Sequence, residues 1–272
     1  MVTFFLILFC LGTPVKDSVL NIYRHLTSEA FKADPPKDPV VNYNRYGALR
    51  KVLHLVVNAL QSAGSEHHLE FDNLLLIVHY YAMRSAMQTL SGLDGHISKI
   101  STSLLRHTNI IPADRAFYEA GLNCRAARKT DMALMFMNRF LDLVEAIEAD
   151  DGMLDPEGFE ETEIPLEVPL PEQVCLPAAD VEEIRNWVLN MSIDQRNTNQ
   201  ELPKDKRGVF EGNIGHHGRP CIITGYPVIS DAIEFRKGHA ANKSDWRSFI
   251  HQVIELIDPI QHYTIRYPFH FP

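Results

Sequence analysis

Residues 113–148 read ADRAFYEAGLNCRAARKTDMALMFMNRFLDLVEAIE, and this stretch decides the fold. Apolar side chains recur at three- and four-residue steps in both halves, which is typical of amphipathic helices. Gly121 and Ala133 leave room for two antiparallel helices to approach each other closely. Phe117 and Phe140 supply the bulk that fills the remaining space. The stretch therefore predicts a closely packed helical hairpin.

The same positions resemble a tetratricopeptide repeat, whose period is about 34 residues. In that comparison Phe117 is the large aromatic residue, Gly121 the glycine and Ala133 the small residue of the second helix. A single repeat cannot bury its own apolar face, so we interpret the helices before it as degenerate repeats of the same stack. A generic amphipathic hairpin is the alternative that the pattern leaves open.

The remainder of residues 13–149 also shows helical periodicity. The stretches 19–31, 48–60, 71–90 and 96–108 each carry apolar residues at helical spacing, and ADPPKDP at 33–39 separates the first two. We therefore predict a mainly α protein, in which a TPR-like α-solenoid is followed by an acidic linker and a small α+β domain.

Residues 150–176 form the predicted linker. Carboxylates and prolines are dense here, and residues 150–172 contain no Lys or Arg. Like charges and prolines oppose packing, so we expect an extended or disordered, solvated tether. Its apolar residues alternate along 164–170, which suggests a strap along the helices. Residues 177–207 then predict a short helix, with Asp180 as a plausible N-cap, followed by a polar loop.

Residues 208–258 contain a different pattern, which begins with RPCIITGYPVI at 219–229. We expect a loop from Cys221, strands at 226–229 and 232–235, a turn at 236–239 and a helix starting near Asn242. This order resembles the U-box, a zinc-free relative of the RING domain. Polar pairs replace the metal ions in that family, since a core this small needs cross-links.

The U-box resemblance implies two sets of functional residues. Its docking site for a ubiquitin-conjugating enzyme, or for ubiquitin, falls on Ile222, Ile223 and Pro227. Pro227 matches the family pattern only loosely, and Ala240–Ala241 replace the aromatic residue usual after the central turn. The polar residues that would cross-link the fold are Thr224, Glu234, Arg236, Asn242, Lys243 and Asp245.

The cysteines predict neither a disulfide framework nor a metal site. Cys10, Cys124, Cys175 and Cys221 are scattered, and no CxxC pair occurs. Histidines at 216, 217, 239 and 251 flank Cys221, but structural zinc sites usually use two close ligand pairs. We interpret Cys221 as a small buried apolar residue and expect no metal, no cofactor and no catalytic residue.

The net charge and the two ends of the chain bear on which partners and which cellular location we expect. The net charge is −9 over 272 residues, which argues against nucleic acid as a partner. Residues 1–12 are apolar but too short for a membrane span, so we expect an atypical start and at most indirect membrane association. A secreted protein is the alternative that these residues suggest. Residues 259–272 are a tail of no predicted structure.

The order of these parts resembles the C-terminal region of the intraflagellar transport 172 family. NQELPKD, CIITGYPV, IEF and AANKSDW carry the resemblance, which covers roughly residues 13–250. It implies a subunit of the intraflagellar transport B complex that contacts other subunits, in the cilium, at the basal body and in the cytoplasm. It also implies a link to cilium assembly and Hedgehog signalling.

Two functions follow from these resemblances. The first is a non-enzymatic scaffold or adaptor that supports cilium assembly and ciliary protein transport through protein–protein contacts. The second is a U-box-type ubiquitin ligase or ubiquitin-binding module acting through residues 221–250. If this module is an enzyme, we expect weak ubiquitin ligase activity.

Overall fold

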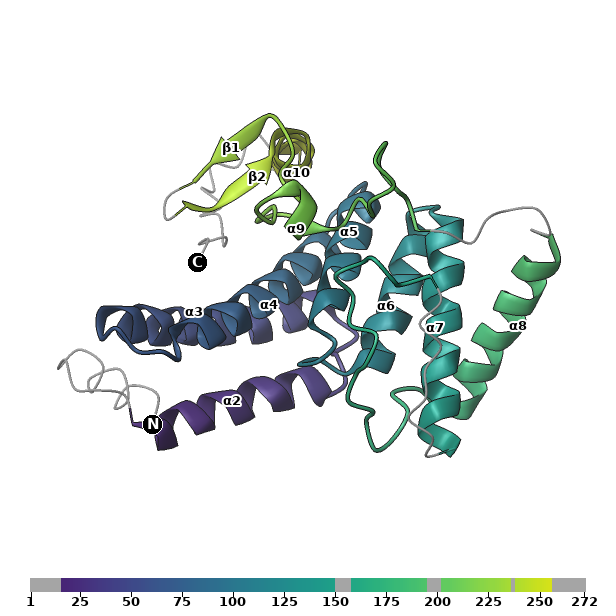
Figure 1. Cartoon of the computed structure of the whole chain (residues 1–272), viewed down its shortest axis with the longest axis horizontal. Coiled ribbons are helices and arrows are strands. Elements are labelled where there is room, and N and C mark those ends of the chain that lie inside the picture. Colours follow the sequence, from purple (N-terminus) through teal and green to yellow (C-terminus); the bar gives the residue numbers. More distant parts are fainter. Residues whose placement is uncertain (1–15, 150–157, 195–201, 236–237, 256–272) are drawn as a thin grey trace. The chain divides into compact units, whose positions relative to one another are not determined.

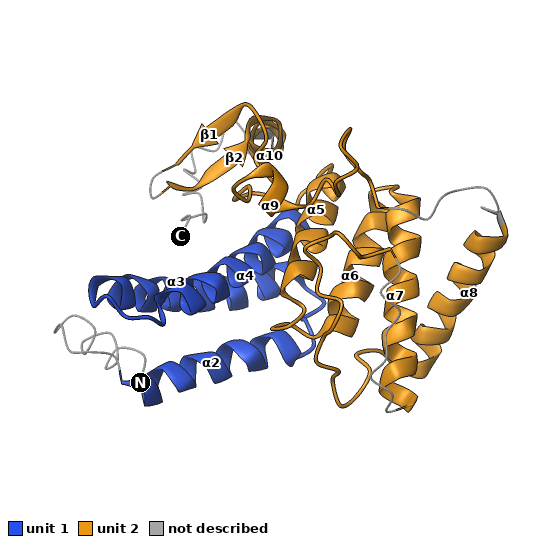
Figure 2. Ribbon diagram, in the orientation of Figure 1, with its two compact units in different colours: residues 1–89, 263–272 blue, residues 90–262 orange. Residues whose placement is uncertain are grey.

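The computed structural model describes residues 16–149, 158–194, 202–235 and 238–255. The predictions for residues 1–12, for Arg236 and for the tail at 259–272 lie outside this part of the chain. Contacts divide the chain into two compact units, with the boundary after Thr89 (Figure 2). The boundary falls inside the region predicted as one stack of helical repeats.

The first unit consists of three helices, α2 (Asp17–Lys32), α3 (Pro39–Ser62) and α4 (His68–Met87) (Figure 1). Asp38 caps α3, because its carboxylate accepts a hydrogen bond from the Val40 amide at 2.8 Å. The ADPPKDP segment therefore acts as the predicted break between helices. Apolar side chains of α3 and α4 form the core: Leu53, Val56, Leu60, Phe71, Leu75 and Val78.

The second unit begins with a helical array of α5 (Asp94–Leu104), the 3₁₀ turn η1 (Leu105–His107), α6 (Ala113–Ala126) and α7 (Thr130–Ala149). Helix α8 (Ala178–Asp194) packs beside α7 at the edge of the array (Figure 1). No helix in the described residues is long and apolar enough to cross a membrane. The described chain is mainly helical, as predicted.

Helices α6 and α7 form the hairpin predicted from residues 113–148. Phe117, Ala133 and Phe140 are almost completely buried. A Cβ atom on Gly121 would lie 2.8 Å from Cγ and Sδ of Met137, so glycine is what permits this close approach. The hairpin turns at Arg128, which has a positive φ of 58°.

The segment at residues 158–177, called the strap below, differs from the expected solvated tether. It has no regular secondary structure, but Phe159 is buried and its ring lies 5.6 Å from that of Phe117. Further along, the Arg139 guanidinium donates to the Leu166 carbonyl at 3.0 Å, and the Cys175 amide donates to Asp114 at 2.7 Å. Aromatic burial and these hydrogen bonds hold the strap against α6 and α7 despite its acidic composition.

Residues 202–255, called the C-terminal module below, carry the two-stranded sheet seen in the described chain. Strand β1 (Ala232–Glu234) pairs antiparallel with β2 (Ala240–Asn242), with Ile233 opposite Ala241. Two helices belong to the module, the single turn α9 (Ile214–His217) and the longer α10 (Lys243–Glu255). The loop–hairpin–helix order was expected, and β1 falls within the strand predicted at 232–235, but its partner strand lies elsewhere.

The expected strand at 226–229 is not present. Pro220 and Pro227 form an isolated bridge, and the strand that pairs with residues 232–234 lies at 240–242, in the region predicted as turn and helix start. Proline lacks a backbone N–H, so the segments around Pro220 and Pro227 cannot extend this bridge into a ladder of hydrogen bonds. The Cys221 amide donates instead to the Tyr226 carbonyl, which closes residues 221–226 into a tight loop.

Candidate functional site

The loop predicted as a docking site is buried in the second unit. Ile222 is 2 % exposed and Ile223 is completely buried, and Pro227 is also buried. A docking residue must offer its side chain to a partner. In this conformation neither isoleucine does, so the three residues act here as core.

Helix α5 and the turn η1 cover this loop. The Ser103 hydroxyl donates to the Thr224 carbonyl at 2.9 Å, and the Arg106 guanidinium donates to the Gly225 carbonyl at 2.7 Å. Arg106 also donates to the Gly212 carbonyl at 3.1 Å and pairs with Glu163 of the strap at 3.0 Å. One arginine therefore connects η1, the strap and the C-terminal module.

Asp245 is the centre of polar contacts within the module and between the module and α5. Its buried carboxylate accepts from the Thr224 hydroxyl at 2.9 Å and pairs with the Lys99 ammonium at 2.8 Å. His96 Nε2 lies 3.1 Å from the Asp245 carbonyl, and burial lowers the pKa of this histidine. The neutral ring, with Nε2 protonated, donates to that carbonyl. Thr224 and Asp245 were both predicted to cross-link the fold, and here they contact each other.

The other predicted cross-linking residues lie nearby but pair with different partners. Asn242 donates through its amide side chain to the Pro227 carbonyl at 3.0 Å. Glu234 forms an exposed ion pair with Arg219. The Lys243 backbone amide donates to the Asp231 carbonyl at 3.0 Å. Whether these contacts stand in for the metal ions of a RING fold stays a prediction.

The described cysteines are poor nucleophiles. Burial raises the pKa of the Cys124 thiol to about 11, and it also raises the pKa values of Cys175 and Cys221. These thiols are protonated at neutral pH, and only the thiolate attacks efficiently. Within the described ranges, no three His, Cys, Asp or Glu side chains are grouped so that they could hold a metal ion.

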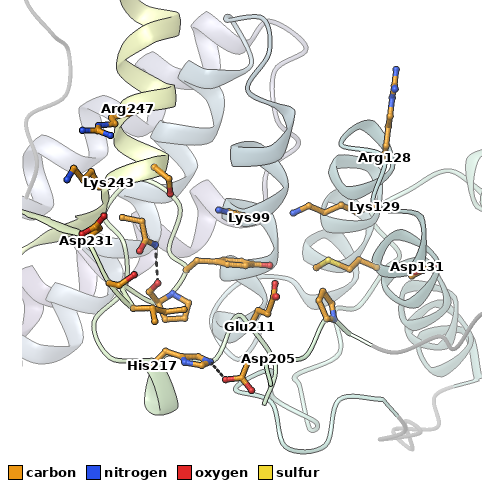
Figure 3. Close-up of a pocket in the computed structure, with 18 of the residues that line it drawn as sticks. Lys99, Arg128, Lys129, Asp131, Asp205, Glu211, His217, Asp231, Lys243 and Arg247 are labelled. Atoms are coloured by element: carbon orange, nitrogen blue, oxygen red, sulfur yellow. Dashed lines mark hydrogen bonds and ion pairs between the residues drawn. The ribbon is translucent and has the colours of Figure 1, made fainter. Parts of the chain in front are cut away.

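A cleft of about 1130 Å³ opens between the helical array and the C-terminal module, within the second unit (Figure 3). Its walls come from α5, from the α6–α7 turn, from the loops at 203–211 and 226–231, and from the start of α10. Its basic residues are Lys99, Arg128, Lys129, Lys243 and Arg247, and its acidic residues are Asp131, Asp205, Glu211 and Asp231. Sequence analysis missed this site, because its residues come from five separate segments.

Two of the three lysines of the cleft, Lys99 and Lys129, differ in their pairing. Lys99 pairs with Asp245 and lies over the Tyr226 ring, 5.6 Å from its centroid. Lys129 forms no ion pair with any described residue. Burial lowers the pKa of Lys129, and the nearby charge of Lys99 lowers it further. The charges of Glu211 and Asp245 act in the opposite direction, so Lys129 faces carboxylates as well as the Lys99 ammonium.

Comparison with known proteins finds similar sequences among intraflagellar transport proteins. No family model matches the chain. It is 42% identical over 260 residues to the human intraflagellar transport protein 172 homolog, a match that covers 92% of this chain and 15% of the relative. It is also 37% identical to intraflagellar transport protein osm-1 of Caenorhabditis elegans, over 82% of this chain and 13% of that protein.

The similarity extends to algae. Intraflagellar transport protein 172 of Chlamydomonas reinhardtii is 34% identical over 83% of this chain and 14% of its own length. The chain thus spans about 15% of the length of the curated relatives it matches. The match supports the family resemblance seen in the sequence and places the similarity in one part of a much longer protein. No observation on the described residues favours the ubiquitin-ligase alternative.

Proposed function

We propose that the chain is a scaffold or adaptor segment of an intraflagellar transport subunit, of the B complex, that supports cilium assembly and ciliary protein transport. The observation that carries this proposal is the similarity to intraflagellar transport 172 proteins over 92% of the chain. Its partners are other intraflagellar transport subunits, and it works in the cilium and at its base. The link to Hedgehog signalling that the resemblance implies would be indirect, because that signalling needs assembled cilia.

The structure supports a contact function in a specific way. The second unit offers a helical array, to which the strap and the C-terminal module are attached by hydrogen bonds and ion pairs. Helix α8 also exposes Leu189 and Ile193, one helical turn apart, at 58% and 52% of their surface. An apolar pair on an outer helix is suited to protein contact, since apolar surface gains free energy when a partner covers it.

Affinity purification from ciliated cells tests this function. The tagged chain is expressed, recovered and analysed for intraflagellar transport subunits by mass spectrometry, and its position is followed by microscopy. We expect several of these subunits with the chain, and we expect the chain in cilia. A chain that stays out of cilia and recovers none of them contradicts the proposal.

Matched variants locate the contact. Leu189→Asp and Ile193→Asp place a charge on the exposed apolar pair, and we expect each to reduce recovery of the partners. Asn190→Asp adds the same charge at an exposed polar position of the same helix and serves as the control. Equal recovery of the partners with all three variants would show that α8 is not part of the contact surface. It would not bear on the ciliary role, which the purification with the parent chain tests.

A further inference from the structure

The cleft of the second unit carries five basic and four acidic side chains, in a protein whose net charge is −9. Lys129 comes from the α6–α7 turn and Lys99 from α5, and both side chains project into the same part of the cleft (Figure 3). The two ammonium groups are close enough for Lys99 to affect the ionisation of Lys129. Like charges this close repel each other, and the carboxylates of Glu211 and Asp245 offset part of that repulsion. An anionic group of a ligand would offset more of it.

Four carboxylates also line the cleft, and the charge of Glu211 lies close enough to Lys129 to raise its pKa. Asp205 is already occupied, because it accepts from the Arg207 guanidinium at 3.0 Å and lies 3.5 Å from His217. Lys99 uses one of its three ammonium protons on Asp245, and two stay available for a ligand. Lys243 and Arg247, from α10, form no ion pair with any described residue and extend the basic surface across the opposite wall.

The apolar part of the cleft indicates the size and kind of ligand. Ile229 lies at the rim and is 67% exposed, which is unusual for an isoleucine, and Met132 and Tyr226 line the interior. A volume of about 1130 Å³ exceeds what a single ion needs and suits several residues of a peptide. An acidic side chain beside an apolar one matches both features of the lining.

We propose that this cleft binds an acidic peptide segment of a partner protein, with a carboxylate held by Lys129 and Lys99 and an apolar side chain against Ile229. The proposal deepens the proposed scaffold function and rests on it only for the partner's cellular identity. A phosphate group offers the same anionic oxygens to the two lysines, so the test includes it as a separate arm.

Fluorescence anisotropy with the full chain tests the site. The probe is a fluorescein-labelled octapeptide of alternating glutamate and leucine, and the matched peptide replaces every glutamate by glutamine. We expect the glutamate peptide to saturate below about 1 mM and to bind at least about tenfold more tightly than the glutamine peptide. Raising NaCl from 0.05 M to about 1 M should abolish most of the binding, because salt screens these charges.

Variants assign the binding to the cleft. Lys129→Gln and Lys243→Gln are expected to weaken the glutamate peptide about five- to tenfold, the loss of one charge-assisted contact. Lys206→Gln removes a charge from an exposed lysine of the neighbouring loop that does not line the cleft, and it should bind like the parent chain. Thermal melting of each variant confirms that it is folded.

Four outcomes overturn the proposal: no saturation below about 1 mM, equal affinity for the glutamine peptide, unchanged affinity in both cleft variants, or binding confined to a phosphoserine peptide or to inorganic phosphate. None of these outcomes bears on whether the chain recovers intraflagellar transport subunits from cells. The peptide experiment and the purification experiment therefore fail independently of each other.

Discussion

The guanidinium of Arg106 donates to the carbonyl oxygen of Gly225 at 2.7 Å, across 119 residues of sequence. The same side chain reaches Gly212 and the carboxylate of Glu163. Arg106 is therefore the residue through which the helical array, the strap and the C-terminal module contact one another. The loop predicted to dock a partner is instead engaged by the chain itself.

Arg106→Ala should lower the free energy of unfolding by about 2–4 kcal/mol, since it leaves two carbonyls and a carboxylate without their donor. Urea denaturation followed by circular dichroism measures the change. Arg185→Ala is the control, because Arg185 pairs with Glu145 on an exposed surface and should contribute less than about 1 kcal/mol. Similar losses in the two variants would mean that Arg106 does not connect these segments.

Ile223→Ala separates a core residue from a docking residue. Because the side chain is fully buried, we expect a loss of about 2–5 kcal/mol in the free energy of unfolding. Ile229→Ala, at an exposed position a few residues after that loop, should change stability by less than about 0.5 kcal/mol. An Ile223→Ala variant as stable as the parent chain would show that this side chain is not part of the core.

Gly121→Val tests the close approach of α6 and α7. The added atoms would meet Met137, so we expect a loss of about 1–3 kcal/mol in the free energy of unfolding from overpacking. Adding Met137→Ala should restore part of that loss by opening space for the valine. Gly95→Ala is the control, because nothing lies within 4 Å of the Cβ that it adds. The close-approach account fails if Gly121→Val is as well tolerated as Gly95→Ala.

His107 should make stability depend on pH. Burial, and then the charge of Arg106, lowers its pKa from 6.5 to about 4. The unfolded chain therefore takes up this proton at a higher pH than the folded chain does. The contribution is complete above pH 6.5 and is lost as pH falls toward 4, a loss of about 3 kcal/mol.

Urea midpoints measured from pH 7.5 to pH 4 test this dependence. His107→Gln should flatten the profile in that range, and the same substitution at the exposed His25 is the control. A profile of His107→Gln that matches the parent chain would exclude His107 as its source.

Local patterns predicted the helices well, and long-range contacts account for what they missed. The hairpin at 113–148 could be read from Gly121, Ala133 and the apolar periodicity, because a helix's packing face repeats at short, regular steps. Of the two predicted strands, that at 232–235 matches β1, but the one at 226–229 is absent and β2 was missed, since Pro227 interrupts the ladder and short strands depend on their partners. The sequence predicted a solvated strap because the residues that hold it in place, such as Phe159, are isolated. They do not recur at regular spacing, so no periodic pattern reveals them.

The candidate site was harder to predict. Ile222 and Ile223 looked like a docking surface because the sequence does not show that α5 and η1 cover them. Arg106 carries no motif, and its role appears only when Gly212 and Gly225 are brought to it. The cleft likewise exists only once Lys99 and Lys129 lie close together in space.

We expect the C-terminal module and the helical array, which Arg106 connects, to unfold as one cooperative unit. The chain's two tryptophans make this measurable, since Trp246 lies in α10 and Trp187 in α8, where it contacts Arg125. Single-tryptophan variants, Trp187→Phe and Trp246→Phe, are unfolded in urea and followed by fluorescence. Coincident transitions are expected, and Arg106→Ala should separate them. A Trp246 transition that lies apart from that of Trp187 in the parent chain, and that Arg106→Ala does not move, would contradict the account.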